Sequence, residues 1–227
     1  MRDFHLPGRS SVFASNGMCA TSNPLATKVA LSILEQGGNA VDAAIAGGIL
    51  LGICEPQMTG IGGDCFILLK TQHSEKIIAL NGSGKSPKTL NAEKLTSKGL
   101  SVVSDDSVDA VTIPGAIDAF CRLSEDYGKV GIAAALAPAI HYAEHGVPIG
   151  PRTSFDWKRN AKNLQGTAKH YYLLNGVIPT PGQIFKVPKQ ADVLRKISIE
   201  GRKAFYEGEI AEDMVNSLKK LGGSHTL

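Results

Sequence analysis

The chain of 227 residues is 43% hydrophobic and 20% charged, a composition typical of a globular protein that can bury a core. Its 24 basic and 21 acidic residues leave a net charge of +3 without a dense basic run. Electrostatics therefore give no support to nucleic-acid or membrane partners. No segment reaches the roughly 18 uninterrupted apolar residues of a membrane span. Four widely spaced cysteines without a CxxC pair are expected to be buried thiols: Cys19, Cys54, Cys65 and Cys121.

The chain opens with a strand and an amphipathic helix. Residues 18–21 predict a short strand. Asn23 and Pro24 then provide a cap and a first helical residue. Apolar residues recur at spacings of three and four up to Leu34, and Gly37 is a suitable terminator. The pattern predicts a helix that packs on one side.

Residues 39–63 (NAVDAAIAGGILLGICEPQMTGIGG) are the most apolar stretch. Asn39 caps a helix whose third residue, Asp42, adds a carboxylate to the first turn. The helix is apolar on every side, which indicates burial. Pro56 ends it, and a glycine cluster leads into a strand-like run. We expect a buried helix, a glycine turn and a core strand.

Two strands follow, at residues 65–69 and 76–80, joined by the polar turn 71–75. A short turn between neighbouring strands favours an antiparallel sheet covered by helices over a doubly wound parallel sheet.

The rest of the chain is mainly helical in pattern. Residues 82–109 are polar and weakly patterned, and residues 166–188 predict a loop with at most a short strand. The helix over 132–144 is either continuous or split in two at Pro138. The predicted helices are 115–127, 132–144, 151–163, 189–199 and 209–221.

Two glycine motifs have a binding and a packing interpretation. The loop GSGKS at 82–86 resembles the end of a phosphate-binding P-loop, but Ala79 stands where the first glycine belongs and Pro87 follows at once. A glycine-rich turn is the default, and a nucleotide-binding module remains a distant alternative. The cluster GIGG at 60–63 suits an anion-binding nest, yet it lacks the strand before it and the helix after it. Packing is favoured there.

No metal, cofactor or nucleophile is indicated. His141 and His145 are spaced i, i+4, but the motif is HYAEH rather than HExxH and has no third ligand, so a solvated helix face is expected. Four other histidines are scattered in polar surroundings without a partner: His5, His73, His170 and His225. No GxSxG elbow is present.

Several motifs together resemble the large subunit of γ-glutamyltranspeptidases. They occur in the family's order and span residues 18–223. They are NPLAT, GGNAVDAA, EPQMTGIGG, VTIPGAIDAF with a following DYG, LAPAIHYAEHG and AFYEGEIAEDMVNSLKKLGG.

The resemblance implies an α+β fold: an αββα sandwich of the N-terminal nucleophile hydrolase type, incomplete in this chain. Residues 1–110 would be a partial core segment and 111–227 a mainly helical lobe. The family is made as a precursor that cuts itself. The new N-terminal threonine of the small subunit attacks a γ-glutamyl amide such as that of glutathione, and backbone N–H groups stabilise the intermediate. This chain is then expected to contain no catalytic residue. Its partners would be the small subunit and an acyl amide.

The family's substrate-binding arginine, in a motif like D-F/G-R-E-x-A-P, is replaced here. The corresponding residues are 81–87, and the arginine is Ser83. Serine offers no bidentate fork for a carboxylate. Lys85 lies two residues on, which in an extended chain is the same side. Lys85 either supplies a point charge to a different acidic acyl group, as in glutaryl-type cephalosporin acylases, or is a solvated lysine.

Two main interpretations remain, a γ-glutamyltranspeptidase-like hydrolase or acyltransferase and an inert scaffold paralogue of that family, with the nucleotide-binding module as a distant third. The end at Leu227 falls inside the family's large subunit, so a fragment is expected. Residues 1–10 lack the apolar region of a signal peptide. A cytoplasmic location follows as an expectation, although the family is often periplasmic or secreted.

Overall fold

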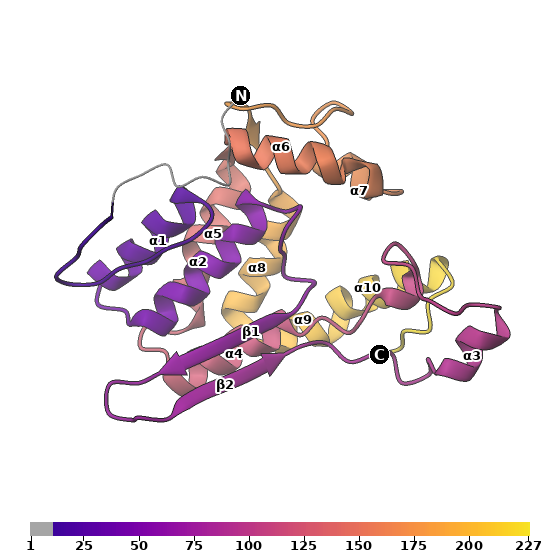
Figure 1. Cartoon of the computed structure of the whole chain (residues 1–227), viewed down its shortest axis with the longest axis horizontal. Helices are drawn as coiled ribbons and strands as arrows, with labels where there is room; N and C mark the ends of the chain where they lie inside the picture. The colour runs from indigo at the N-terminus through magenta and orange to yellow at the C-terminus, as the bar shows by residue number, and fades with distance from the viewer. Residues whose placement is uncertain (1–10) are drawn as a thin grey trace.

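The computed structural model describes residues 11–227, in which helices form the body and one long hairpin lies on its surface (Figure 1). The expected lack of a signal peptide concerns residues 1–10, which lie outside the described residues. The helices are α1 (Pro24–Glu35), α2 (Ala40–Cys54), α3 (Ala92–Ser97), α4 (Ala116–Tyr127), α5 (Ile132–His145), α6 (Pro151–Asn160), α7 (Ala168–Tyr172), α8 (Pro188–Glu200), α9 (Lys203–Tyr206) and α10 (Gly208–Lys220). The strands are β1 (Cys65–Lys70), β2 (Ile77–Gly82), β3 (Val147–Pro148) and β4 (Ile184–Phe185).

Helix α2 is the centre of the core, as its sequence predicts. It packs against α1, α4 and α5, and most of its apolar residues are buried, although Ala40 and Ala44 are exposed. Gly47 faces Ala30 of α1, and Gly48 faces Phe120 of α4, so two glycines keep the helix thin where its neighbours approach. Helices α5 and α8 continue the same core, and Figure 1 shows α8 beside α5.

The start of α2 is fastened to a distant turn. The Asn39 side chain accepts the N–H groups of Val41 and Asp42, and the Asp42 carboxylate accepts the N–H of Asn39, which completes a capping box. Asp42 is 0% exposed and also accepts the N–H groups of Lys129 and Val130, which join α4 to α5. A local cap therefore also locks the connection between two other helices.

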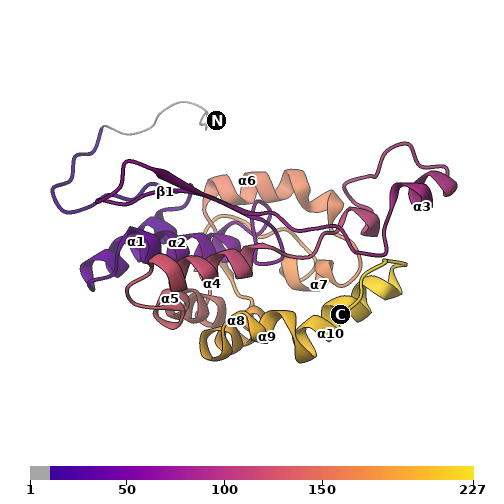
Figure 2. The ribbon, with the colours of Figure 1, turned by 90° about the horizontal axis from the view of Figure 1, so that it is seen from below.

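The hairpin is antiparallel, with Cys65 opposite Gly82 and Lys70 opposite Ile77. Burial alternates along both strands, so one face lies against the helices and the other faces outward. Figure 2 shows α1, α2 and α4 on one side of the hairpin. The outward face carries large apolar side chains: Phe66 is 69% exposed, Leu68 78% and Ile77 66%. The predicted hairpin is confirmed, and its outer face is left apolar.

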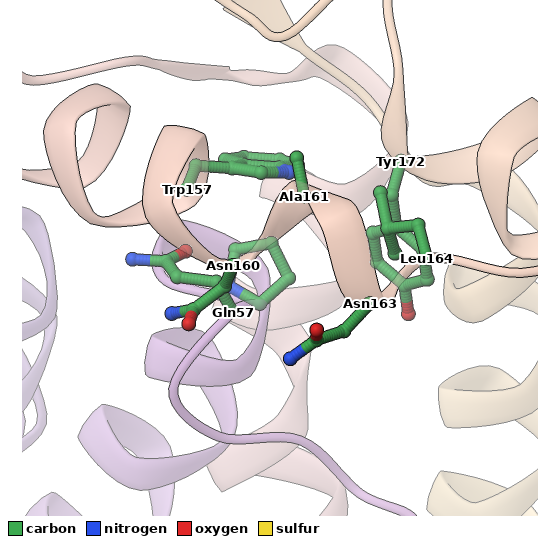
Figure 3. Close-up of a pocket in the computed structure, with 8 residues that line it drawn as sticks. Gln57, Trp157, Asn160, Ala161, Asn163, Leu164 and Tyr172 are labelled. Atoms are coloured by element: carbon green, nitrogen blue, oxygen red, sulfur yellow. The ribbon is translucent and has the colours of Figure 1, made fainter. Parts of the chain in front are cut away.

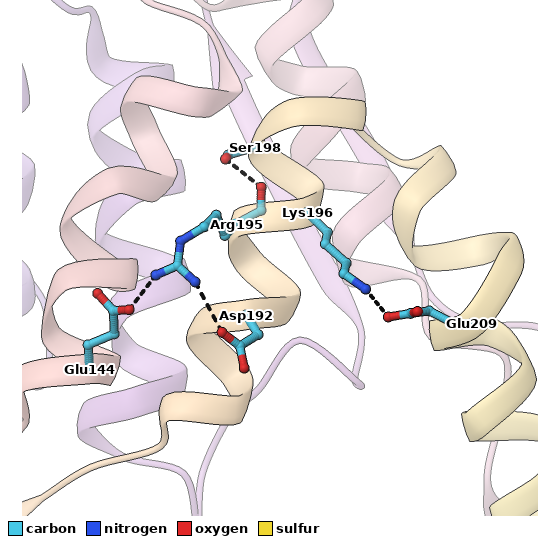
Figure 4. A network of polar contacts seen from close by, with 6 residues as sticks. All are labelled: Glu144, Asp192, Arg195, Lys196, Ser198 and Glu209. Atoms are coloured by element: carbon cyan, nitrogen blue, oxygen red, sulfur yellow. Dashed lines mark hydrogen bonds and ion pairs between the residues drawn. The ribbon is translucent and has the colours of Figure 1, made fainter.

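Ion pairs join α8 to its neighbours (Figure 4). Arg195 pairs with Glu144 of α5 and with Asp192 one turn earlier in α8. Lys196 pairs with Glu209 at the start of α10. All of these side chains are well exposed to solvent, so they align helices without adding much stability.

Two local predictions need correction, those for residues 18–21 and 166–188, and the structure settles two points that the sequence leaves open. Residues 18–21 form no strand and belong to neither of the two sheets within residues 11–227. Helix α5 runs unbroken through Pro138, since packing on α2 and α8 outweighs one lost hydrogen bond. The stretch 82–109 contains α3, capped by Asn91. The stretch 166–188 contains α7 as well as the short strand β4. The other predicted helices are present within one or two residues, except that α6 ends in a 3-10 turn at Ala161–Asn163.

Candidate functional site

The candidate site lies at the open end of the hairpin, where three segments far apart in sequence meet: residues 60–64, 81–85 and 112–115. The carbonyl of Gly63 accepts the N–H groups of Gly115 (3.1 Å) and Ala116 (3.0 Å). The carbonyl of Lys85 accepts the N–H of Ile113 (2.9 Å). Backbone hydrogen bonds therefore tie the two loops that flank the hairpin to the start of α4.

Glycine is required where these segments touch. A Cβ on Gly84 would lie 2.0 Å from the carbonyl oxygen of Ile113, and one on Gly115 would lie 2.1 Å from the carbonyl oxygen of Gly82. Such distances are far inside van der Waals contact, so any side chain would push the segments apart. The glycines of GSGK thus permit a close backbone approach.

Ser83 and Lys85, the two residues that the sequence singles out, are both exposed on this loop. The Ser83 N–H donates to Oδ1 of Asn81 (2.9 Å). In the part of the chain that the structure describes, the Lys85 ammonium makes no ion pair or hydrogen bond. The loop therefore has a fixed backbone and presents an unpaired cation to solvent.

The P-loop interpretation of GSGKS is not supported by the structure. Residues 83–87 are irregular, and the next helix, α3, begins only at Ala92 and has six residues. A phosphate-binding loop needs a helix directly after it, whose N–H groups point at the anion. The default interpretation, a glycine-rich turn after an edge strand, describes what is seen.

The loop 55–63 lines two cavities that no sequence pattern indicates. One, of about 350 Å³, lies between Gln57 and the α6–α7 region; Figure 3 shows Trp157, Asn160 and Tyr172 around it. The Gln57 Oε1 atom is buried without a hydrogen-bond partner. The other cavity, of about 380 Å³, is lined by the GIGG cluster itself. Tyr172 lines both cavities. It belongs to a segment that the sequence predicts to be a loop, so no local pattern indicates this role.

A third cavity, of about 590 Å³, is lined by residues 111–114, by α10 and by residues 225–227. His225 lines it, is 2% exposed, and its Nε2 is 2.8 Å from the carbonyl oxygen of Val111. The expectation that His225 lies in polar surroundings without a partner is therefore wrong, because the chain folds back after α10. His141 and His145 are stacked at 4.3 Å on the surface of α5. Within residues 11–227 no group of three metal-binding side chains occurs.

The cysteines are free thiols, and two are fully buried. Burial raises the pKa of Cys54 to about 12, with a further contribution from the neighbouring Glu55 carboxylate. Burial raises the pKa of Cys121 to about 11. Cys19 and Cys65 are partly exposed, and burial raises their pKa as well. None of them is poised as a thiolate nucleophile.

Comparison with protein families gives one match, to the model described as gamma-glutamyltranspeptidase, over residues 26–227. The match covers most of the chain. The chain therefore belongs to the gamma-glutamyltranspeptidase family.

Two curated relatives of the chain are named as proenzymes. The chain is 34% identical over 220 residues to the glutathione hydrolase-like YwrD proenzyme of Bacillus subtilis, covering 96% of the chain and 42% of that protein. It is 30% identical over 225 residues to the oxamate amidohydrolase proenzyme of Klebsiella pneumoniae, again with 96% and 42% covered. The chain thus spans less than half the length of these relatives.

Solved structures share the fold. The cephalosporin acylase from Bacillus halodurans is 37% identical with a TM-score of 0.90, covering 99% of this chain and 43% of that one. The Helicobacter pylori gamma-glutamyltranspeptidase is 28% identical with a TM-score of 0.89, covering 96% and 64%. No helix within residues 11–227 combines the length and the apolar character needed to cross a bilayer.

Proposed function

We propose that this chain is the N-terminal part of the large subunit of an N-terminal nucleophile hydrolase precursor. The matured enzyme hydrolyses or transfers the acyl group of γ-glutamyl or related amides such as glutathione. Named relatives include a glutathione hydrolase-like protein, an amidohydrolase and an acylase, and amide cleavage is the chemistry common to those names. The nucleophilic threonine comes from the small subunit, where its own α-amine acts as base.

The observation that carries the acyl-binding part of this proposal is Lys85, whose ammonium is unpaired and whose loop is held by backbone hydrogen bonds. An acyl donor with a carboxylate needs a cation that is held in place but not already neutralised. Ser83, which stands where the family resemblance puts an arginine, has no charge to offer. Lys85 provides a point charge rather than a planar fork, so it accepts a range of acidic acyl groups with less geometric selection.

The small subunit also accounts for the apolar face of the hairpin. A two-stranded sheet is marginal by itself, and three large apolar side chains on its outer face are exposed: Phe66, Leu68 and Ile77. A contiguous apolar surface of this kind marks an interface. We propose that the small subunit covers this face and completes the αββα sandwich. The division into a core segment, 1–110, and a helical lobe, 111–227, stays a prediction.

Steady-state kinetics on the complete, matured precursor test the role of Lys85. Lys85→Ala is expected to raise KM about tenfold or more for glutaryl and γ-glutamyl anilides, because a charge-assisted contact is lost. The KM for an uncharged butyryl anilide stays unchanged. Lys88→Ala is the matched control, since Lys88 is an exposed lysine on the same loop. Equal KM values for Lys85→Ala and the parent with acidic donors would exclude a role for Lys85 in binding the acyl carboxylate.

An inert scaffold is the competing outcome. The gene downstream of residue 227 distinguishes the two: a self-cleaving threonine followed by a glycine-rich segment supports the enzyme. Absence of that threonine, together with no amide cleavage by the purified product, would favour the scaffold.

A further inference from the structure

The backbone N–H of Gly84, between Ser83 and Lys85, has a partner from a distant part of the chain. It donates to Oδ1 of Asp64, at 2.9 Å. Asp64 lies just before β1, twenty residues earlier, and its side chain is exposed. A side-chain oxygen thus holds the backbone of the loop that carries the proposed acyl-binding lysine.

The ends of the two strands explain why a side chain is used there. With Cys65 opposite Gly82, a continued antiparallel register would bring Gly84 opposite Gly63. The Gly63 carbonyl, however, already accepts two N–H groups, from Gly115 and Ala116. Asp64 supplies the acceptor that the strand no longer offers, so the N–H of Gly84 is satisfied and the loop stays next to the sheet.

The three contacts on this loop differ in kind. Asn81 accepts the Ser83 N–H within the same turn, and the Lys85 carbonyl is held by the N–H of Ile113. The Asp64 contact links the loop directly to the start of β1. Because it acts on the residue just before Lys85, its loss would let the lysine backbone move relative to the sheet while the rest of the fold stays intact.

We propose that Asp64 is a positioning residue for acyl binding: through the Gly84 N–H it fixes the loop from which Lys85 reaches the carboxylate of the acyl donor. The inference rests on the proposed function. It predicts that the KM for acidic acyl donors depends on a hydrogen-bond acceptor at position 64 and not on the negative charge of that side chain.

Hydrogen–deuterium exchange on the complete precursor tests the contact itself. Asp64→Ala is expected to speed exchange in the peptide spanning residues 81–88 by about three- to tenfold, the range for losing one hydrogen bond. Asp64→Asn keeps an oxygen acceptor at the same position and is expected to exchange like the parent. Peptides from α2 serve as an internal control for the fold. Unchanged exchange in Asp64→Ala would overturn the proposal.

Kinetics on the matured enzyme test the consequence. Asp64→Ala is expected to raise KM for acidic acyl donors about three- to tenfold, with kcat and the KM for the butyryl anilide unchanged. Asp64→Asn restores the parent KM to within about twofold, since an exposed charge several ångströms away is screened.

The outcomes separate this proposal from the one it rests on. A raised KM in Lys85→Ala with an unchanged KM in Asp64→Ala would overturn only the role of Asp64. An unchanged KM in Lys85→Ala would overturn the acyl site itself. A fall in kcat equal to the rise in KM, or failure of Asp64→Asn to rescue, would indicate a general structural role and overturn positioning.

Discussion

Two aspartates, Asp42 and Asp64, make the same kind of hydrogen bond in very different surroundings. Each accepts backbone N–H groups from a segment far along the chain: Asp42 from Lys129 and Val130, and Asp64 from Gly84. Asp42 is 0% exposed, while Asp64 is open to solvent. Burial decides what the hydrogen bond contributes, because water replaces a lost acceptor at the surface but not in the core.

The region around Asp42 is therefore the part of the molecule whose polar contacts maintain stability. The region around Asp64 is the part whose polar contacts set position. Three sets of substitutions test this contrast, and their expected effects decrease from the first to the last.

Replacing the buried aspartate is expected to have the largest effect. Asp42→Ala removes the acceptor of three N–H groups, those of Asn39, Lys129 and Val130. Because these donors are left in the interior, we expect a loss of about 3–5 kcal/mol in the free energy of unfolding. Urea unfolding measures it. Asp64→Ala is the matched control and should cost less than about 1 kcal/mol. Similar losses for the two variants would contradict the contrast.

Adding a side chain where the backbone segments of the site touch is expected to have the next largest effect on stability. A Cβ on Gly115 would meet the Gly82 carbonyl oxygen at 2.1 Å, so Gly115→Ala is expected to cost about 2–3 kcal/mol by forcing the backbone segments apart. Gly60→Ala, in the same site, is the control, because nothing lies within 4 Å of the added atom. Thermal unfolding of both variants makes the comparison. An unchanged melting temperature for Gly115→Ala would show that the site tolerates movement.

The sequence predicts the region around α2 and Asp42 better than it predicts the candidate site. For α2, the cap at Asn39, the apolar surface and the stop before Pro56 are all local signals, and each is confirmed. The link from Asp42 to Lys129 is not local, and neither is the contact of Gly84 with Asp64. No spacing rule connects residues twenty or more positions apart, so side-chain partners of this kind emerge only in the fold.

Family resemblance, rather than a physical pattern, points to the site. Ser83 and Lys85 stand out because a family motif is altered there, whereas physical reasoning alone predicts only a glycine-rich turn. The cavity lined by Trp157 and Tyr172 has no sequence signal, because its walls come from segments around 57 and 157–172 that share no periodicity. The burial of His225 escapes prediction for the same reason, since it depends on the return of the chain towards Val111.

The thiols give the smallest and most local test of the contrast, because Cys54 ends α2 and Cys65 begins β1. Burial, with the Glu55 carboxylate, raises the pKa of Cys54 to about 12, whereas Cys65 is partly exposed. Between pH 9 and 12 the unfolded chain loses the Cys54 proton while the folded chain keeps it. The free energy of unfolding therefore falls as pH rises, by about 2 kcal/mol between pH 9 and 11 from this group.

The comparison of stability at pH 8 and pH 11 in the Cys54→Ala and Cys65→Ala variants measures this effect. Cys54→Ala is expected to be less stable than the parent at pH 8, because a small cavity is left, yet to lose less stability on raising the pH. Cys65→Ala should keep most of the parent's pH dependence, because its thiol is less buried. Equal flattening of the pH dependence by both substitutions would mean that the start of β1 is as closed to water as the end of α2.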